Sequence, residues 1–217
     1  MSDYIRDAII RGVFETLQMT FFSSLFAYII GLPLGVILYV TSKGRLYENR
    51  PVNAIIGFIV NLFRSLPFLI LLVLFIPVTR FLVGSSIGTT ASIVPLTIGT
   101  IPIVARMVES SLNEVPPGII EAANSMGASP LFIIIHFIIP EAFPSLLLGA
   151  AINIATVLGY SAMAGVIGGG GLGAIALQYG YYRYDKTVLW ITVSILILMV
   201  MIIQEAGVKL SKRTRKA

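Results

Sequence analysis

TLQMTFFSSLFAYIIGLPLGVILYVTS, residues 16–42, decides the fold class of this 217-residue chain. The stretch contains no Asp, Glu, Lys or Arg, and further charge-free stretches follow at 65–79, 81–105, 142–182 and 187–204. A helix needs ~20 apolar residues to cross the hydrocarbon core of a bilayer, and inside lipid every backbone polar group must be bonded within the segment. A barrel would alternate apolar and polar residues, whereas these runs are continuous. We therefore expect an all-α protein that crosses the membrane several times.

The overall composition excludes most other classes of protein. With 57% hydrophobic and 12% charged residues, the chain lies far from the composition of soluble domains. Residues 1–15 mix acids and bases, unlike a cleavable signal peptide. The chain has no cysteine and a single histidine, His136, so a metal site is not expected. The net charge of +5 comes largely from the tail at 209–216, which favours a topology signal over nucleic-acid binding.

The apolar runs predict five spans and an orientation. The spans are expected at about 16–40, 52–78, 90–107, 144–164 and 187–205. Basic residues then fall on two sides. One side holds Lys43, Arg45, Arg50, Arg106, Lys209, Lys212, Arg213, Arg215 and Lys216, and the other holds Arg6, Arg11, Arg80, Arg183 and Lys186. Because cytoplasmic loops carry the excess of Lys and Arg, we expect the N-terminus outside and the C-terminus in the cytoplasm.

The second span contains a proline and a cation that its length alone does not explain. Pro67 follows Arg64-Ser65-Leu66 in its middle, and proline kinks or starts a helix. Two interpretations remain open: one long kinked helix, or a short interfacial helix at 52–63 followed by the span itself. Arg64 either marks the start of that span or pairs with an acid or with backbone carbonyls.

The longest polar interval lies at about 108–142, between the third and fourth spans, and contains EAANSMGASPLFIIIHFIIP at 121–140. The breaker Pro116-Pro117-Gly118 precedes a short predicted helix at 119–126, for which Gly127 is a suitable C-terminal cap. Ser129-Pro130 then fits an N-cap followed by proline in the first turn. We expect a short exposed helix, a sharp bend at Gly127 and a second helix that returns to the membrane.

This interval resembles the EAA loop of ABC importer permeases, the element that docks the membrane subunit onto its ATPase. The match is EAA at 121–123, a glycine four residues later, and FIIP at 137–140, where the family form ends in I-x-L-P. The resemblance implies that small alanines let a partner approach closely while Glu121 offers a carboxylate. The alternative is an ordinary solvated loop. The implied coupling residues are Glu121, Ala122, Ala123, Gly127 and Pro140.

A second group of polar residues lies in the fourth span. Asn153, Thr156, Tyr160 and Met163 are spaced three and four apart, so they share one helix face. Polar groups on one stripe of a membrane helix face protein or a water-filled cavity. They either line the translocation pathway and its gate, or simply bond and pack against a neighbouring helix. The glycine-rich run at 168–173 is interpreted as flexible backbone on the outer side.

Further matches extend the resemblance over nearly the whole chain and narrow it to methionine ABC importer permeases. They are Gly12-Val13-x-Glu15-Thr16-Leu17-x-Met19-Thr20, Gly31-Leu32-Pro33-Leu34-Gly35, Phe63-Arg64-Ser65-x-Pro67-Phe68, Ile93-Val94-Pro95-Leu96-Thr97 and Gly159-Tyr160-Ser161-Ala162-Met163. The resemblance implies a single permease domain over 1–217 with type I importer architecture, working as a homodimer in the bacterial inner membrane. It also implies a cytoplasmic ABC ATPase and an extracytoplasmic substrate-binding lipoprotein as partners.

The same resemblance assigns ATP chemistry to the partner. The chain has no G-x-x-x-x-G-K-[ST] sequence, so it is not expected to be an enzyme, and ATP and Mg²⁺ are expected on the ATPase. Other amino acids or small peptides are the alternative substrates. A secondary transporter would show intramembrane carboxylates or repeated broken helices, and a non-transport assembly subunit would not need an EAA loop.

Overall fold

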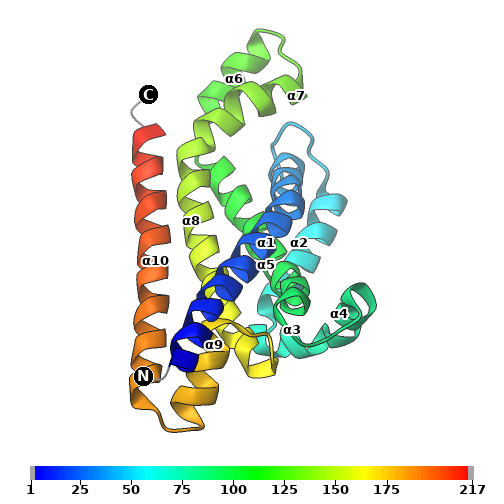
Figure 1. Ribbon diagram of the computed structural model, residues 1–217. Helices are drawn as coiled ribbons and strands as arrows, with labels where there is room; N and C mark the ends of the chain where they lie inside the picture. The colour runs from blue at the N-terminus through cyan, green and yellow to red at the C-terminus, as the bar shows by residue number, and fades with distance from the viewer. Residues whose placement is uncertain (1–2, 215–217) are drawn as a thin grey trace.

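The computed structural model describes residues 3–214, and all regular secondary structure in that part of the chain is helical (Figure 1). The elements are α1 (Asp3–Thr41), α2 (Arg50–Ser65), α3 (Phe68–Leu74), α4 (Ile76–Val83), α5 (Thr89–Asn113), α6 (Pro117–Ser125), α7 (Pro130–Ile133), α8 (Ile139–Ala164), α9 (Gly171–Ile175) and α10 (Lys186–Thr214). Single turns of other helix types join them: π-helical at Ile134–Ile138 and Ala176–Tyr181, and 3₁₀ at Gly165–Ile167.

Four helical segments are long and apolar enough to cross a membrane, and a pair of helices bent at a short break is the fifth candidate span. The four contain α1, α5, α8 and α10, and the pair is α2 with α3. The five predicted spans are therefore confirmed, although most of the helices extend beyond the predicted limits. α1 has 39 residues, ~58 Å at ~1.5 Å per residue, which exceeds the ~30 Å hydrocarbon core. Figure 1 shows that it crosses the bundle at a slant.

Neither interpretation of the second span was right. α2 and α3 meet at an angle of 102°, far sharper than a kink in one long helix. α2 is not a separate interfacial helix either, because it packs along α1 and α5: Val60 of α2 lies in one buried cluster with Leu38 and Ala105. Leu66, before Pro67, is extended at φ −78° and ψ 131°, since the proline ring excludes the helical conformation from the residue before it. The chain then turns aside into α3 and α4 (Figure 1).

Two glycines allow α1 and α5 to lie in close contact. A Cβ on Gly31 would lie 2.8 Å from the Val104 Cβ, and one on Gly35 would lie 2.5 Å from the Ala105 carbonyl oxygen. Gly31 and Gly35 therefore form a small-xxx-small contact with α5.

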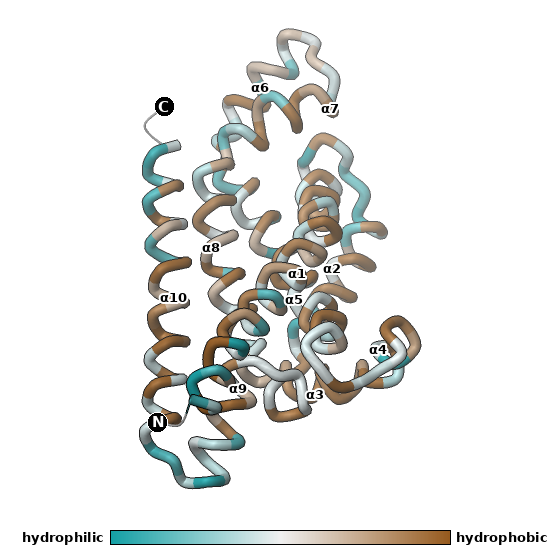
Figure 2. The backbone as a smooth tube through the Cα atoms, in the orientation of Figure 1, coloured by the Kyte–Doolittle hydropathy of each residue, from teal (hydrophilic) through white to brown (hydrophobic). Residues whose placement is uncertain are grey.

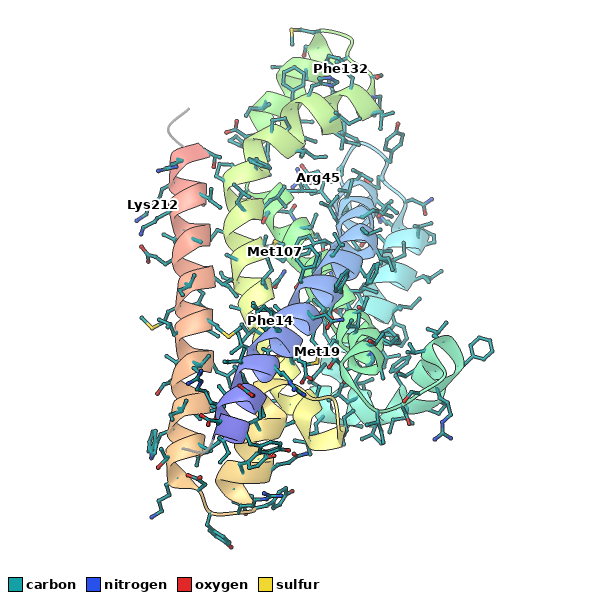
Figure 3. The ribbon with its side chains drawn as sticks, viewed as in Figure 1. Phe14, Met19, Arg45, Met107, Phe132 and Lys212 are labelled. Carbon is teal, nitrogen blue, oxygen red and sulfur yellow. The ribbon has the colours of Figure 1, made fainter. Side chains whose placement is uncertain are left out.

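The polar residues gather at the two ends of the bundle, as Figure 2 shows most clearly along α10. One end holds the 42–49 loop, α6, α7 and the end of α10, and the other holds the N-terminus, α4, α9 and the start of α10 (Figure 1). Arg45 and Lys212 both lie toward the first end (Figure 3). The two sets of basic residues separated by sequence therefore lie toward opposite ends, with two exceptions. Arg106 bonds Gly57 and Asn61 part of the way along α2, and Arg215 and Lys216 lie outside the described residues.

Candidate coupling loop and translocation pathway

The 114–138 segment projects from one end of the bundle and carries α6 and α7 (Figure 1). α6 begins with Pro117 in its first turn, where the missing N–H costs no helical hydrogen bond. Glu121 and Ala122 are exposed. Ala123 is fully buried, in the cluster that includes Leu112 and Ile133. Of the two alanines, Ala122 alone is therefore accessible to a partner, and Ala123 fixes α6 to the bundle.

Gly127 ends α6 in the way the sequence predicted. Its φ is +76°, in the left-handed region that favours glycine. Its N–H donates to the Asn124 carbonyl (2.9 Å) and the Ala128 N–H donates to the Ala123 carbonyl (3.2 Å), so carbonyls at the helix end are satisfied. A Cβ at Gly127 would meet no heavy atom within 4 Å. The glycine is needed for its backbone conformation and not for space within this chain.

α7 starts as predicted and leads back into the bundle. The Ser129 Oγ accepts from the Phe132 N–H (3.4 Å), and Pro130 occupies the first turn. The sequence did not predict the π-helical turn at Ile134–Ile138 that joins α7 to α8. His136 lies in this turn and stacks on Phe132 at 4.1 Å between ring centroids. Among residues 3–214 no group of three His, Cys, Asp or Glu residues is placed to hold a metal ion. Pro140 is exposed at the start of α8.

The exposed surface of α6 and α7 is suited to contact with another protein. Met126 is 73% exposed and Leu131 is 60% exposed, at the tip of a loop whose inner face is packed into the core. Exposed apolar side chains beside the carboxylate of Glu121 form a mixed surface of the kind that mediates protein association.

The 42–49 loop lies beside α6, which the sequence did not predict. A cavity of about 320 Å³ is lined by residues of both segments, including Arg45 and Glu121. Arg45 donates to the Asn113 Oδ1 (2.7 Å) and lies over the Tyr39 ring at 4.5 Å. This loop thereby braces the end of α5, from which the projecting segment starts. From the sequence, the positive charge of Arg45 indicated only the orientation of the chain in the membrane. It did not predict the contacts of Arg45 with Asn113 and Tyr39.

Glu48 organises the same loop. It accepts from the Gly44 N–H (2.8 Å) and from Arg50 (2.9 Å). These two bonds hold the pKa of the Glu48 carboxyl below its ordinary value, the Gly44 bond contributing most. The carboxylate is thus ionised at neutral pH and keeps the loop closed.

The structure divides the polar stripe of α8 into three environments. Asn153 is buried, and its Nδ2 donates to the Tyr28 hydroxyl of α1 (3.2 Å), so it bonds a neighbouring helix. Thr156 and Tyr160 line a cavity of about 290 Å³ between α2, α3 and α5. The Tyr160 ring stacks on Phe68 of α3, with 3.9 Å between centroids and 7° between planes. Met163 is exposed.

The glycine-rich run is a packed turn, so its interpretation as flexible backbone was wrong. Gly168, Gly170 and Gly171 all have positive φ, between +76° and +85°. A Cβ on Gly171 would lie 2.8 Å from the Thr16 Oγ1, and one on Gly173 would collide with the Ala162 backbone. These glycines therefore provide left-handed backbone and close approach.

Glu15 of α1 fixes the same turn. Its Oε2 accepts from the Gly171 N–H (2.6 Å), while the Thr16 Oγ1 accepts from the Leu172 N–H (2.9 Å). The two α1 side chains thus satisfy donors at the start of α9. This contact could not be predicted from the sequence, because 156 residues separate the partners.

A polytopic helical bundle with a projecting EAA-type loop defines the membrane subunit of an ABC importer. The chain belongs to the family of binding-protein-dependent transport system inner membrane components, whose pattern matches residues 31–216. It is therefore a permease subunit and not an enzyme, and the expected type I importer architecture is confirmed.

Its relatives are more specific. The chain is 51% identical over 207 residues to the probable D-methionine transport system permease protein MetI of Vibrio cholerae, covering 95% of this chain and 92% of that one. It is 52% identical over 165 residues to the D-methionine transport system permease protein MetI of Escherichia coli K12, covering 76% of each. It also matches a chain of the inward-facing MetNI methionine ABC transporter with a TM-score of 0.97, at 48% identity and 99% coverage of both. A histidine-bound amino acid ABC transporter, at 24% identity and a TM-score of 0.79, shares the fold.

Proposed function

We propose that this chain is the permease subunit of an ATP-driven methionine importer. The observation that supports it most strongly is the 51% identity to a D-methionine permease across 95% of the chain. A permease for another amino acid or a small peptide is the alternative, because the EAA-type loop does not depend on the substrate.

In this proposal the whole chain, 1–217, is one transmembrane domain, with the coupling loop at about 108–142. Glu121, Ala122, Gly127 and Pro140 contact a cytoplasmic ABC ATPase that binds ATP and Mg²⁺. Ala123 acts from inside, since its burial beside Leu112 ties α6 to the end of α5. The exposed position of α6 supports this assignment.

The translocation pathway lies between two copies of the chain. We assign Thr156, Tyr160 and Met163 to its lining and gate, with Asn153 holding α8 against α1. The exposed face that contains Met163 and the cavity beside Tyr160 support this reading. ATP binding closes the two ATPase subunits, α6 moves with them, and the paired membrane domains alternate between inward-open and outward-open states. A lipoprotein loaded with substrate drives the exchange only by binding the outward-facing state more tightly.

We further propose that the protein lies in the bacterial inner membrane with its N-terminus outside. The chain has no cysteine, so single cysteines report on each side without background. Ser85 and Lys43 are both exposed, toward opposite ends of the bundle. In intact spheroplasts a membrane-impermeant maleimide should label Ser85→Cys and leave Lys43→Cys unlabelled until the membrane is permeabilised. The reverse pattern would invert the orientation.

Uptake into proteoliposomes tests the function. The vesicles contain this chain and its ATPase, with ATP inside and the methionine-loaded binding protein outside. Labelled methionine should accumulate only with ATP, and other amino acids and dipeptides should not compete. Accumulation of a competitor instead would reject methionine and keep the importer. Uptake that does not depend on ATP would indicate a secondary transporter. If the complex is intact and hydrolyses ATP but takes up none of the candidate substrates, the chain would be a non-transport assembly subunit.

A further inference from the structure

Arg64 is an exposed cation near the C-terminal end of α2. It lies 14 residues after Arg50, the first residue of α2, and therefore ~21 Å along the helix axis at ~1.5 Å per residue. The hydrocarbon core is ~30 Å thick, so Arg64 lies within it if Arg50 marks the membrane surface. A guanidinium at that depth needs an anion, backbone carbonyls or water, and such residues commonly mark the path of a substrate.

Arg106 on the neighbouring helix bonds within the bundle through its two terminal nitrogens, while its buried Nε has no partner among the described residues. Arg106 donates to the Glu109 carboxylate (2.6 Å), and also to the Gly57 carbonyl and the Asn61 Oδ1 (both 3.1 Å). Arg64 lies one helical turn beyond Asn61 and makes no hydrogen bond or ion pair with residues 3–214. The two arginines of the packed helices α2 and α5 thus differ. Arg106 has a carboxylate partner, Glu109, and Arg64 has none among residues 3–214.

No acidic residue of this chain is available to Arg64. The sequence has ten acids, and none of them lines the cavity that Arg64 enters. The nearest along α5 is Glu109, which is engaged by Arg106. The carboxylates lie at positions 3, 7, 15, 48, 109, 114, 121, 141, 185 and 205.

The cavity beside Arg64 has the features that a zwitterionic, apolar amino acid requires. Its volume of about 290 Å³ is near the lower end of ligand pockets, ~300–1,000 Å³. Phe68 and Tyr160 give it aromatic surface, against which a thioether packs favourably. The Thr156 hydroxyl donates to the Ile152 carbonyl (2.9 Å), so its lone pairs are free to accept from an ammonium group.

We propose that Arg64 binds the carboxylate of the amino acid in transit, and that this cavity is a substrate site within the membrane. The planar guanidinium donates two parallel hydrogen bonds to the carboxylate, with the side chain of the substrate against the Phe68 and Tyr160 rings. This inference rests on the proposed function and adds to it the residue that recognises the substrate.

Uptake and ATP hydrolysis, measured together on the reconstituted complex, test the role of Arg64. Arg64→Gln should lower methionine uptake at least tenfold, while the ATPase rate stimulated by loaded binding protein stays within about twofold of wild type. Arg64→Lys keeps the charge and loses the bidentate geometry, so its rate of methionine uptake should lie between those of wild type and Arg64→Gln. Arg80→Gln is the matched control, because Arg80 is also exposed and without an ion pair among residues 3–214, but lies in α4. It should transport normally.

A binding measurement separates recognition from a structural role. The nucleotide-free complex of wild type should bind one more labelled L-methionine per permease copy than the Arg64→Gln complex. Methioninol, which lacks the carboxylate, should not displace that additional methionine. Any of three results would overturn the assignment. The two complexes could bind equal amounts of methionine, or Arg64→Gln could take up methionine normally. The third is that the Gln and Lys variants lose uptake and ATPase stimulation to the same extent. Absence of ATP-driven methionine uptake by wild type would instead reject the proposed function.

Discussion

Replacing Gly127 by tryptophan should separate the chain from its ATPase while leaving its fold intact. At φ +76° an L-residue costs ~1–2 kcal/mol, a factor of ~5–30 in the population of the local conformation. No heavy atom lies within 4 Å of the Cβ position, so the β-carbon itself adds no clash to this cost. An effect larger than that of the same substitution at a matched glycine would come from the partner that packs against the tip of α6.

Gly84 provides the matched control. It ends α4 with φ +79°, and a Cβ there also meets nothing within 4 Å. Gly84→Trp therefore carries the same backbone strain, but lies far from α6 (Figure 1). The two variants should show equal loss of thermal stability in detergent.

The assay is co-purification of the ATPase with tagged permease, followed by stimulated ATP hydrolysis. Gly127→Trp should retain less than a tenth of the wild-type ATPase, and Gly84→Trp should retain nearly all of it. Gly127→Asn, which tolerates the left-handed region, should lie close to wild type. Normal ATPase retention and transport by Gly127→Trp would refute the docking role of α6.

Three further substitutions test the packing that positions the site, each by thermal unfolding of the purified protein. Gly35→Ala should destabilise by ~1–3 kcal/mol, because the new Cβ would lie 2.5 Å from the Ala105 carbonyl oxygen; no change would mean that α1 and α5 are further apart. Tyr28→Phe should cost ~0.6 kcal/mol by removing the acceptor for Asn153, and Tyr28→Phe in an Asn153→Leu background should cost almost nothing. Glu15→Gln should cost ~0.3–1 kcal/mol by neutralising the carboxylate at the start of α9, whereas a stabilised variant would contradict the capping role.

Features set by local chemistry were predictable from sequence. Gly127 and Ser129 define a helix end and a helix start through their own backbone and side-chain bonds. The charge-free runs define spans because a continuous apolar run, without the alternation of a barrel strand, satisfies its backbone in lipid only as a helix. The small residues Gly31 and Gly35 indicate a close helix contact, although the sequence does not say with which helix.

Features set by contacts between distant residues were not predictable. Pro67 predicts a break, but its angle depends on how α2 packs against α1 and α5. The glycine-rich run looks flexible until Glu15 and Thr16, far away in sequence, are seen to bond it. Ala123 is small enough either to allow a partner protein to approach or to pack in the core. Only the structure shows that it is buried in the core.

Cysteine protection on α6 tests the central claim, that this chain works by docking an ATPase, most directly. Ala122→Cys is exposed and Ala123→Cys is buried, one residue apart in a chain without other cysteines. In the isolated permease a maleimide should label Cys at 122 at least tenfold faster than at 123, and addition of the ATPase should abolish labelling at 122. Labelling of Ser85→Cys should not change. Undiminished labelling at 122 in a complex shown to contain the ATPase would contradict the account.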